Sequence, residues 1–434
     1  MLPVQFCNYN LDYQQRLGFL KVVTWAGRNV RGGKEELQRK IESLYGKNAD
    51  RARKAGRLPS HSGLQFDPEM LLRHEEAPSW QPGFSSQRID RLVLWAEMLG
   101  LVTPAGRLAE WSKPLIVDET TFDPHVPELA NPFLLSRRDR SYFLALLMFH
   151  DHVLFHLTSA LMRLEPGTRI DARRACIEVT KALCLTLDCA AGINIHAARS
   201  RQMLRDLLER LAGAEHISNK HAFLNPVERE NALQHMGAKP LRNHLAEYHA
   251  VCRFEQLTDL GLLVKEDPFK PSTTDEARER ARKSWAWYTT DGLRSFRAQE
   301  LNGDCDVEGY LESQWARSCF LHQRFTIDLD PVKNQLEIAR LLDGALPRAR
   351  RQLGAIQVHT WVFIAALDAI DQGMAFEFKQ AYALLDAMRH DPRYSSYLRQ
   401  SGQQTYLGRT ASLIGGSMYD SLCQYPITRV GGSL

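Results

Sequence analysis

Apolar residues recur every three or four positions over most of the chain, which is the spacing of amphipathic helices. The clearest case is the segment 88–102, RIDRLVLWAEMLGLV. It predicts a helix that is capped by Ser85 or Ser86, ends at Gly100 and leads directly into a strand. The turn residues Pro-Ala-Gly that follow predict a hairpin with its returning strand at 107–111.

The same order of elements occurs a second time. Residues 241–266, LRNHLAEYHAVCRFEQLTDLGLLVKE, predict a longer helix that ends at Gly261 and is followed by a strand at 262–265. A long charged loop, 267–283, separates this strand from a returning strand at 285–289. The chain therefore contains a weak internal repeat of helix, Leu-Gly-Leu, strand, turn and strand.

This order resembles the winged-helix superfamily over residues 85–114 and 240–296. The resemblance implies a recognition helix that reads base edges and a basic wing that holds phosphates, although winged helices also serve as protein–protein modules. The order of modules looks like the recognition halves of some restriction and nicking endonucleases. It also looks like the DNA-binding subunits of bacterial phage-defence systems.

The predicted fold class is mainly α with small β-hairpin wings, arranged as two winged-helix units joined by helical bundle segments. In the C-terminal part a third helix-turn-helix can be built from residues 356–398. The expected divisions are a basic N-terminal segment at 1–60, a first winged-helix unit at 61–120, a helical spacer at 121–235, a second winged-helix unit at 236–300 and a C-terminal helical domain at 301–434.

The total charge of +4 on 434 residues is uninformative about partners. The distribution of the charge along the chain is informative. The first 60 residues hold twelve Lys and Arg against five Asp and Glu, an excess of seven. Clustered cations of this kind suit the neutralisation of phosphates or form a solvated surface. The residues expected to bind double-stranded DNA are Arg28, Arg31, Lys34, Gln87, Arg88, Arg91, Arg242, Asn243, Arg253, Arg282 and Lys283.

A glycine-rich loop at 27–34 follows a strand-like run, KVVTW, at 21–25. A phosphate-binding P-loop requires four residues between its glycines and a Ser or Thr after the lysine. Here five residues separate Gly27 from Gly33, and Glu35 follows the lysine. The spacing therefore argues against a nucleotide site.

A nuclease would have to use the C-terminal third. Glu377 and Lys379 form an E-x-K triplet, with Asp368 or Asp371 upstream as a second carboxylate for magnesium. Such a site needs these residues on adjacent strands, whereas the apolar run 361–370 predicts a helix. The three weak catalytic candidates are thus Glu377, Lys379 and Asp368.

The segment 141–162 is the most apolar in the chain, and its histidines favour a buried helix over a membrane span. His152 and His156 lie one turn apart, a zinc-binding spacing, but Val153 stands where a metalloprotease has Glu. We expect hydrogen-bonded core histidines and no metal site.

Eight cysteines without a CxxC pair, and an N-terminus without a targeting pattern, indicate a cytoplasmic protein with reduced thiols. The first hypothesis is a non-enzymatic protein that holds duplex DNA without a cofactor, in a bacterial phage-defence or mobile-element setting. The alternatives are a magnesium-dependent DNA endonuclease and a protein–protein module of a larger defence complex.

Overall fold

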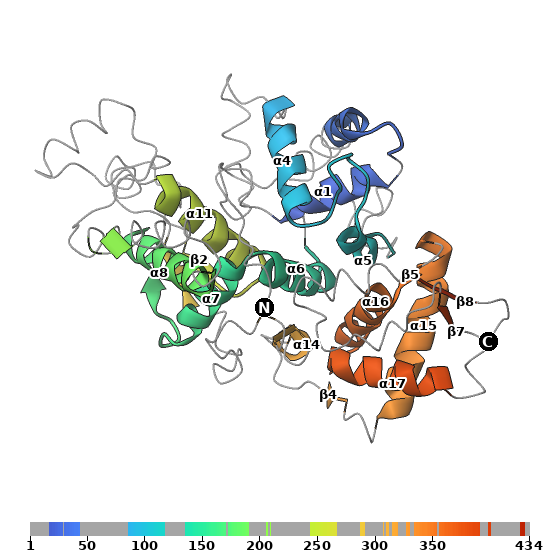
Figure 1. Ribbon diagram of the computed structural model, residues 1–434. Coiled ribbons are helices and arrows are strands. Elements are labelled where there is room, and N and C mark those ends of the chain that lie inside the picture. The colour runs from blue at the N-terminus through green and yellow to red at the C-terminus, as the bar shows by residue number, and fades with distance from the viewer. Residues whose placement is uncertain are drawn as a thin grey trace, which may run out of the picture.

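The computed structural model gives a mostly helical protein (Figure 1). Helices account for 74% and strands for 5% of the part of the chain that it describes, which confirms the predicted mainly α fold. The described residues are 17–28, 30–43, 86–117, 135–170, 172–190, 205–206, 209, 244–266, 287–290, 307, 310–311, 315–319, 327–329, 334–353, 356–390, 398–400 and 426–429.

The N-terminal unit, as we call the described residues 17–117, is built from short helices and one small hairpin. Helix α1 packs against α4 and α5 and is buried on nearly every face. The strand expected at 21–25 is therefore wrong, because packing on all sides outweighs the strand preference of Val22, Val23 and Thr24. Its elements are α1 (Gly18–Gly27), a helix at 34–43, α4 (Ser86–Met98), η2 (Glu110–Ser112) and α5 (Lys113–Val117).

Helix α4 and the hairpin after it follow the sequence prediction, with a shorter returning strand. Gly100 has φ +64°, and the amide of Leu101 donates to the carbonyl of Ala96 over 2.8 Å, which closes the helix in a Schellman motif. The hairpin holds a single bridge between Val102 and Leu108, and the chain then enters η2 where a strand to residue 111 was expected.

The apolar segment 141–162 forms two helices, α6 (Arg137–His150) and α7 (His152–Met162), and not the single helix that was expected. Asp151 between them has φ −130° and ψ 84°, and the two helices are bent by 111°. Among the described residues no single helix is long and apolar enough to cross a membrane, and this bent pair passes that test only when taken together.

The middle unit combines α7 with a three-stranded sheet in the order β1-β3-β2. Strand β3 pairs antiparallel with β2 and also with β1, so Ile170 lies opposite Tyr288. This pairing crosses the expected division between residues 235 and 236, because the strand β1 comes from the predicted spacer. Its further elements are β1 (Arg169–Ile170), α8 (Ala172–Ala190), α11 (His244–Asp259), β2 (Val264–Glu266) and β3 (Trp287–Thr289).

The described elements of the C-terminal unit follow a similar succession of helix, short strand, helix, helix, strand and strand, with one additional strand between the second and third helices. Its sheet has the order β5-β8-β7, so the first strand again pairs with the last. The elements are α15 (Gln335–Leu353), β5 (Ile356–Gln357), α16 (Val358–Asp371), α17 (Phe378–His390), β7 (Leu398–Gln400) and β8 (Pro426–Arg429). Between α16 and α17, β6 (Met374–Ala375) pairs in parallel with β4 (Ile327–Asp328).

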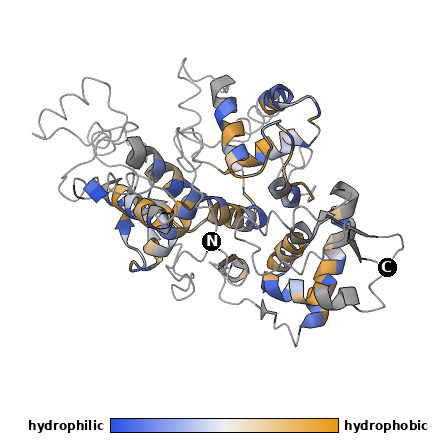
Figure 2. Cartoon of the chain, viewed as in Figure 1, coloured by the Kyte–Doolittle hydropathy of each residue, from blue (hydrophilic) through white to orange (hydrophobic). Residues whose placement is uncertain are grey.

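One hydrophobic core runs through the described residues of all three units. Helix α6 lies between the middle unit and the C-terminal unit, and contacts α16 (Figure 1). Phe363 of α16 packs against Trp111, Tyr142 and Trp315, which lie on η2, α6 and α14 (Trp315–Ser318). Figure 2 shows hydrophobic residues along α16, which is buried over most of its length. The units are therefore packed together through aromatic side chains.

Candidate nucleic-acid interface

Two glycine-containing loops of the N-terminal unit meet at the surface. Gly106, at the tip of the hairpin, has φ +73°, and a Cβ atom on it would lie 2.7 Å from the Cα of Lys34 and 2.9 Å from its nitrogen. The backbone of the hairpin therefore touches the backbone of the first loop, and only glycine fits at this contact. Arg107 follows Gly106 in the chain, so this contact brings its backbone close to that of Lys34. Lys34 was predicted from the sequence to contact DNA.

Glu36 organises the first of these loops. Its carboxylate accepts hydrogen bonds from the amides of Arg31 (2.9 Å) and Gly32, and it forms an ion pair with Lys40 at 2.7 Å. The Lys40 side chain and then the two amides lower the pKa of Glu36 to about 2. Because its backbone is held in this way, the loop presents the Arg31 side chain to solvent.

We define the loop cations as Arg31, Lys34 and Arg107. Arg31 and Arg107 are exposed and Lys34 is half-buried, while Glu35 is an exposed acid beside them. Arg31 and Lys34 were predicted. Arg107 was missed, although the Pro-Ala-Gly turn directly before it indicated a residue at a hairpin tip.

Arg28 has a structural role in addition to its charge. Its guanidinium lies 4.3 Å from the ring centroid of Trp25 and donates to the carbonyl oxygen of Ile116. The side chain is half-buried, and it links α1 to the end of α5. Arg28 was expected to contact DNA, but it is less accessible than the loop cations.

Helix α4, predicted as a recognition helix, presents a mixed surface. Its Arg91 is half-buried, while Asp90 and Leu94 are exposed, and Asp90 accepts a hydrogen bond from Gln38. The described outer face of α4 is therefore not basic. Gln87 and Arg88 lie in its first turn, and their side chains are outside the described residues.

Arg253, a predicted DNA contact of the second repeat, lies in the core of the structure. Its side chain is 0% exposed and donates to Asp151 over 2.8 Å, and Asp151 is itself fully buried. Its other terminal nitrogen lies 2.8 Å from the Nδ1 atom of His249. Arg253 is thus a core residue that joins α11 to the break between α6 and α7, and the expectation that it binds DNA is wrong.

The rest of α11 is buried in the same way. Every described side chain from residue 249 to residue 257 is buried, and Glu255 accepts a hydrogen bond of 2.6 Å from the Tyr288 hydroxyl. Figure 1 shows α11 beside α8, against which it packs. This half of α11 has no face with which to enter a DNA groove. The predicted contacts Arg242, Asn243, Arg282 and Lys283 lie outside the described residues.

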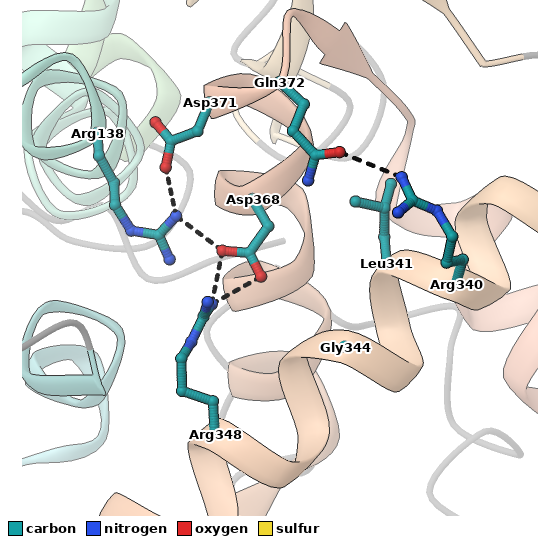
Figure 3. A pocket seen from close by; sticks show the side chains of 8 residues that line it. All are labelled: Arg138, Arg340, Leu341, Gly344, Arg348, Asp368, Asp371 and Gln372. Atoms are coloured by element: carbon teal, nitrogen blue, oxygen red, sulfur yellow. Dashed lines mark hydrogen bonds and ion pairs between the residues drawn. The ribbon is translucent and has the colours of Figure 1, made fainter. Parts of the chain in front are cut away.

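The catalytic candidate Asp368 is held by two arginines (Figure 3). Arg138 of α6 donates to its Oδ1 over 2.9 Å, and the same nitrogen donates to Asp371 over 2.8 Å. Arg348 of α15 contacts both oxygens of Asp368 at 2.6 and 2.7 Å. Both carboxylate oxygens are therefore committed to ion pairs.

These residues line a cavity of about 350 Å³, together with Arg340, Leu341, Gly344 and Gln372. Arg340 also pairs with Glu337. The lining holds three arginines and two aspartates, and Glu337, which is not part of the lining, pairs with Arg340 as the third carboxylate. The cluster is best understood as an ion-pair network that joins α6 to α15 and α16.

The other two catalytic candidates form a local pair. The Lys379 nitrogen lies 2.9 Å from Glu377, and the Glu377 amide donates to Gln380 over 3.0 Å at the start of α17. The helix predicted over 361–370 is present as α16. In the described residues the carboxylates and the lysine are placed on helices and their ends, and not on adjacent strands.

Three histidines around α6, α7 and α11 are buried, His152, His156 and His249, and a fourth, His150 at the end of α6, is half-buried. Burial, and then the charge of His152, lowers the pKa of His150 to about 3 and that of His156 to about 4. Burial also lowers the pKa of His152 and of His249. These side chains are therefore neutral at pH 7. Within the described ranges, no group of three or more His, Cys, Asp and Glu side chains is placed to hold a metal ion.

Comparisons of the chain with protein-family models, with curated proteins and with solved structures found no match in any of the three.

Proposed function

We propose that this protein binds double-stranded DNA and does not cut it, and that the N-terminal unit makes the contact. The setting that we propose, on the resemblance of its module order, is bacterial phage defence or a mobile element. We also propose that the protein acts together with protein partners in a defence complex. No metal or other cofactor is needed for it.

The topology of the middle and C-terminal units supports a winged-helix origin. Apart from β6, which lies between α16 and α17, the described elements of both units follow the order helix, strand, helix, helix, strand, strand, and in both sheets the first described strand pairs with the last. A winged helix has this same order, with its wing between the last two strands. In the described residues of the N-terminal unit, helices at 18–27, 34–43 and 86–98 precede the hairpin, which is compatible with the same plan.

The observation that carries the proposal is the position of the loop cations. Arg31, Lys34 and Arg107 belong to two loops that touch where Gly106 meets Lys34, and Glu36 fixes the backbone of the first loop. Exposed cations on a preorganised backbone are suited to phosphates, because each contact releases a counterion. In the middle unit the helix that corresponds to α4 is α11, and its described side chains from residue 249 to residue 257 are buried. In this proposal the middle unit is therefore a structural support.

Binding of the full chain to a mixed-sequence duplex, followed by fluorescence anisotropy, tests the proposal. We expect the logarithm of the affinity to fall linearly with the logarithm of the salt concentration, by about 0.9 per phosphate neutralised. Absence of binding at low salt would overturn it. Cleavage of plasmid in the presence of magnesium or manganese would instead favour the endonuclease.

A further inference from the structure

We infer that the hairpin 103–107 and the loop 31–34 form one composite phosphate-binding surface, in which Arg107 is a contact residue and Gly106 a positioning residue. The inference rests on the proposed function and names the ligand group, a phosphate of the duplex backbone.

The contact between the two loops is made by backbone atoms. A side chain at position 106 would meet the Cα and the nitrogen of Lys34, and also the carbonyl carbon of Gly33 at 3.1 Å. These atoms belong to the start of the helix at 34–43 and cannot turn aside as a flexible side chain does. Any larger residue at 106 therefore separates the hairpin from the loop and moves Arg107 away from Lys34.

The hairpin itself is closed independently of this contact. The amide of Thr103 donates to the carbonyl of Arg107 over 2.7 Å, and the Arg107 amide donates to the Thr103 hydroxyl over 3.2 Å. The Gly106 amide donates to the Thr103 carbonyl over 2.8 Å. The Arg107 side chain thus projects from a rigid turn, and the position of that turn depends on residue 106.

The charges near this surface favour an anion. The three loop cations stand against two exposed acids, Glu35 and Asp90, of which Asp90 accepts a hydrogen bond from Gln38. The Glu36 carboxylate is already used by two amides and Lys40. Exposed cations such as Arg31 and Arg107 can reach the phosphates of a duplex backbone. Contacts of this kind position a protein on DNA without reading its sequence.

The test measures the salt dependence of duplex binding for the full-length chain and its variants. Arg107→Gln should reduce the slope of log affinity against log salt by about 1, whereas Arg163→Gln, an equal loss of charge at an exposed position, should leave it unchanged. Gly106→Ala should lower the slope although it removes no charge. Its control is Gly373→Ala, which has a similar φ of +79° and no atom within 4 Å of the added Cβ.

The outcomes separate the inference from the proposed function. If the wild type binds and Arg107→Gln keeps its slope, the composite surface is wrong and DNA binding stands. If Arg107→Gln lowers the slope but a folded Gly106→Ala does not, the positioning role is wrong. If the wild type does not bind, the proposed function fails and the inference fails with it.

Discussion

The N-terminal unit and the middle unit both contain a helix that ends at a glycine and leads into a strand, yet the two helices have different surroundings. Gly100 and Gly261 have φ +64° and +80°. Leu262 donates to the carbonyl of Leu257 over 2.9 Å, as Leu101 does to that of Ala96. The helix α4 keeps exposed residues, whereas every described side chain of α11 from residue 249 to residue 257 is buried.

The difference teaches that a local motif does not determine which helix faces solvent. In the middle unit the helix α11 is covered by α8 and by the break between α6 and α7. Its polar residues therefore act within the core, where Arg253 neutralises Asp151. In the N-terminal unit the loops beside α4 remain open, and their cations are available to a ligand.

The largest expected effect is on the buried ion pair of the middle unit. Arg253→Met leaves the Asp151 carboxylate buried without its partner, so we expect the free energy of unfolding to fall by about 3–5 kcal/mol. Urea denaturation followed by circular dichroism measures this loss. The matched variant Arg91→Met, on α4, should change stability by less than about 0.5 kcal/mol. Equal effects at the two positions would contradict the contrast between these helices.

Acid should destabilise the fold through its buried histidines. His150 and His156 have folded pKa values of about 3 and about 4, below the ordinary histidine pKa of 6.5, so the unfolded chain binds more protons. Stability should therefore decline as the pH falls below about 6.5, by up to about 1.4 kcal/mol per pH unit for each histidine. Thermal unfolding between pH 7 and pH 5 measures this, and His156→Gln should flatten the decline. An unchanged profile in that variant would refute the assignment.

A smaller effect is expected at the helix end of the N-terminal unit. Gly100→Ala places a Cβ 3.1 Å from Trp111 and 3.3 Å from His150, at a residue with positive φ. We expect a loss of about 2 kcal/mol, against about 1 kcal/mol for Gly373→Ala, where the added atom meets nothing. Chemical denaturation of both variants measures the two losses. Gly100→Ala reports backbone strain together with steric crowding, and Gly373→Ala reports backbone strain alone. A greater loss at Gly373 would contradict the packing around Gly100.

The smallest effect concerns the acid beside the loop cations. Glu35 is exposed and opposes an approaching phosphate, so Glu35→Gln should raise affinity for duplex DNA about two- to fivefold at low salt. Glu178→Gln, on α8 of the middle unit, should not change the affinity. A similar gain from both variants would indicate a general effect of net charge and no local surface.

Local signals in the sequence predicted the elements that local interactions determine. The helix α4, both glycine helix ends, the hairpin at 102–108 and the helix α16 were all predicted from apolar spacing and turn residues. Each depends on residues within a few positions of one another. Arg31 and Lys34 were singled out as DNA contacts because charge clustering is also visible locally, and their role stays a prediction.

Features that depend on distant residues could not be predicted in this way. Arg253 and Asp151 are 102 positions apart, and nothing near Arg253 in the chain shows that its helix is covered. The strand β1 has only two residues, and its partner in β3 follows more than a hundred positions later. The strand expected at 21–25 became a helix for the same reason, since its surroundings come from α4 and α5.

Lysine footprinting on the full chain, with and without a mixed-sequence duplex, compares the units most directly. The reagent acetylates amines that solvent can reach. The probes are Lys34 of the N-terminal unit, which is half-buried, and the exposed Lys181 of α8 and Lys379 of α17. We expect DNA to protect Lys34 and to leave the other two lysines unchanged. Protection of Lys181 or Lys379 with Lys34 still reactive would contradict the placement of the DNA contact on the N-terminal unit.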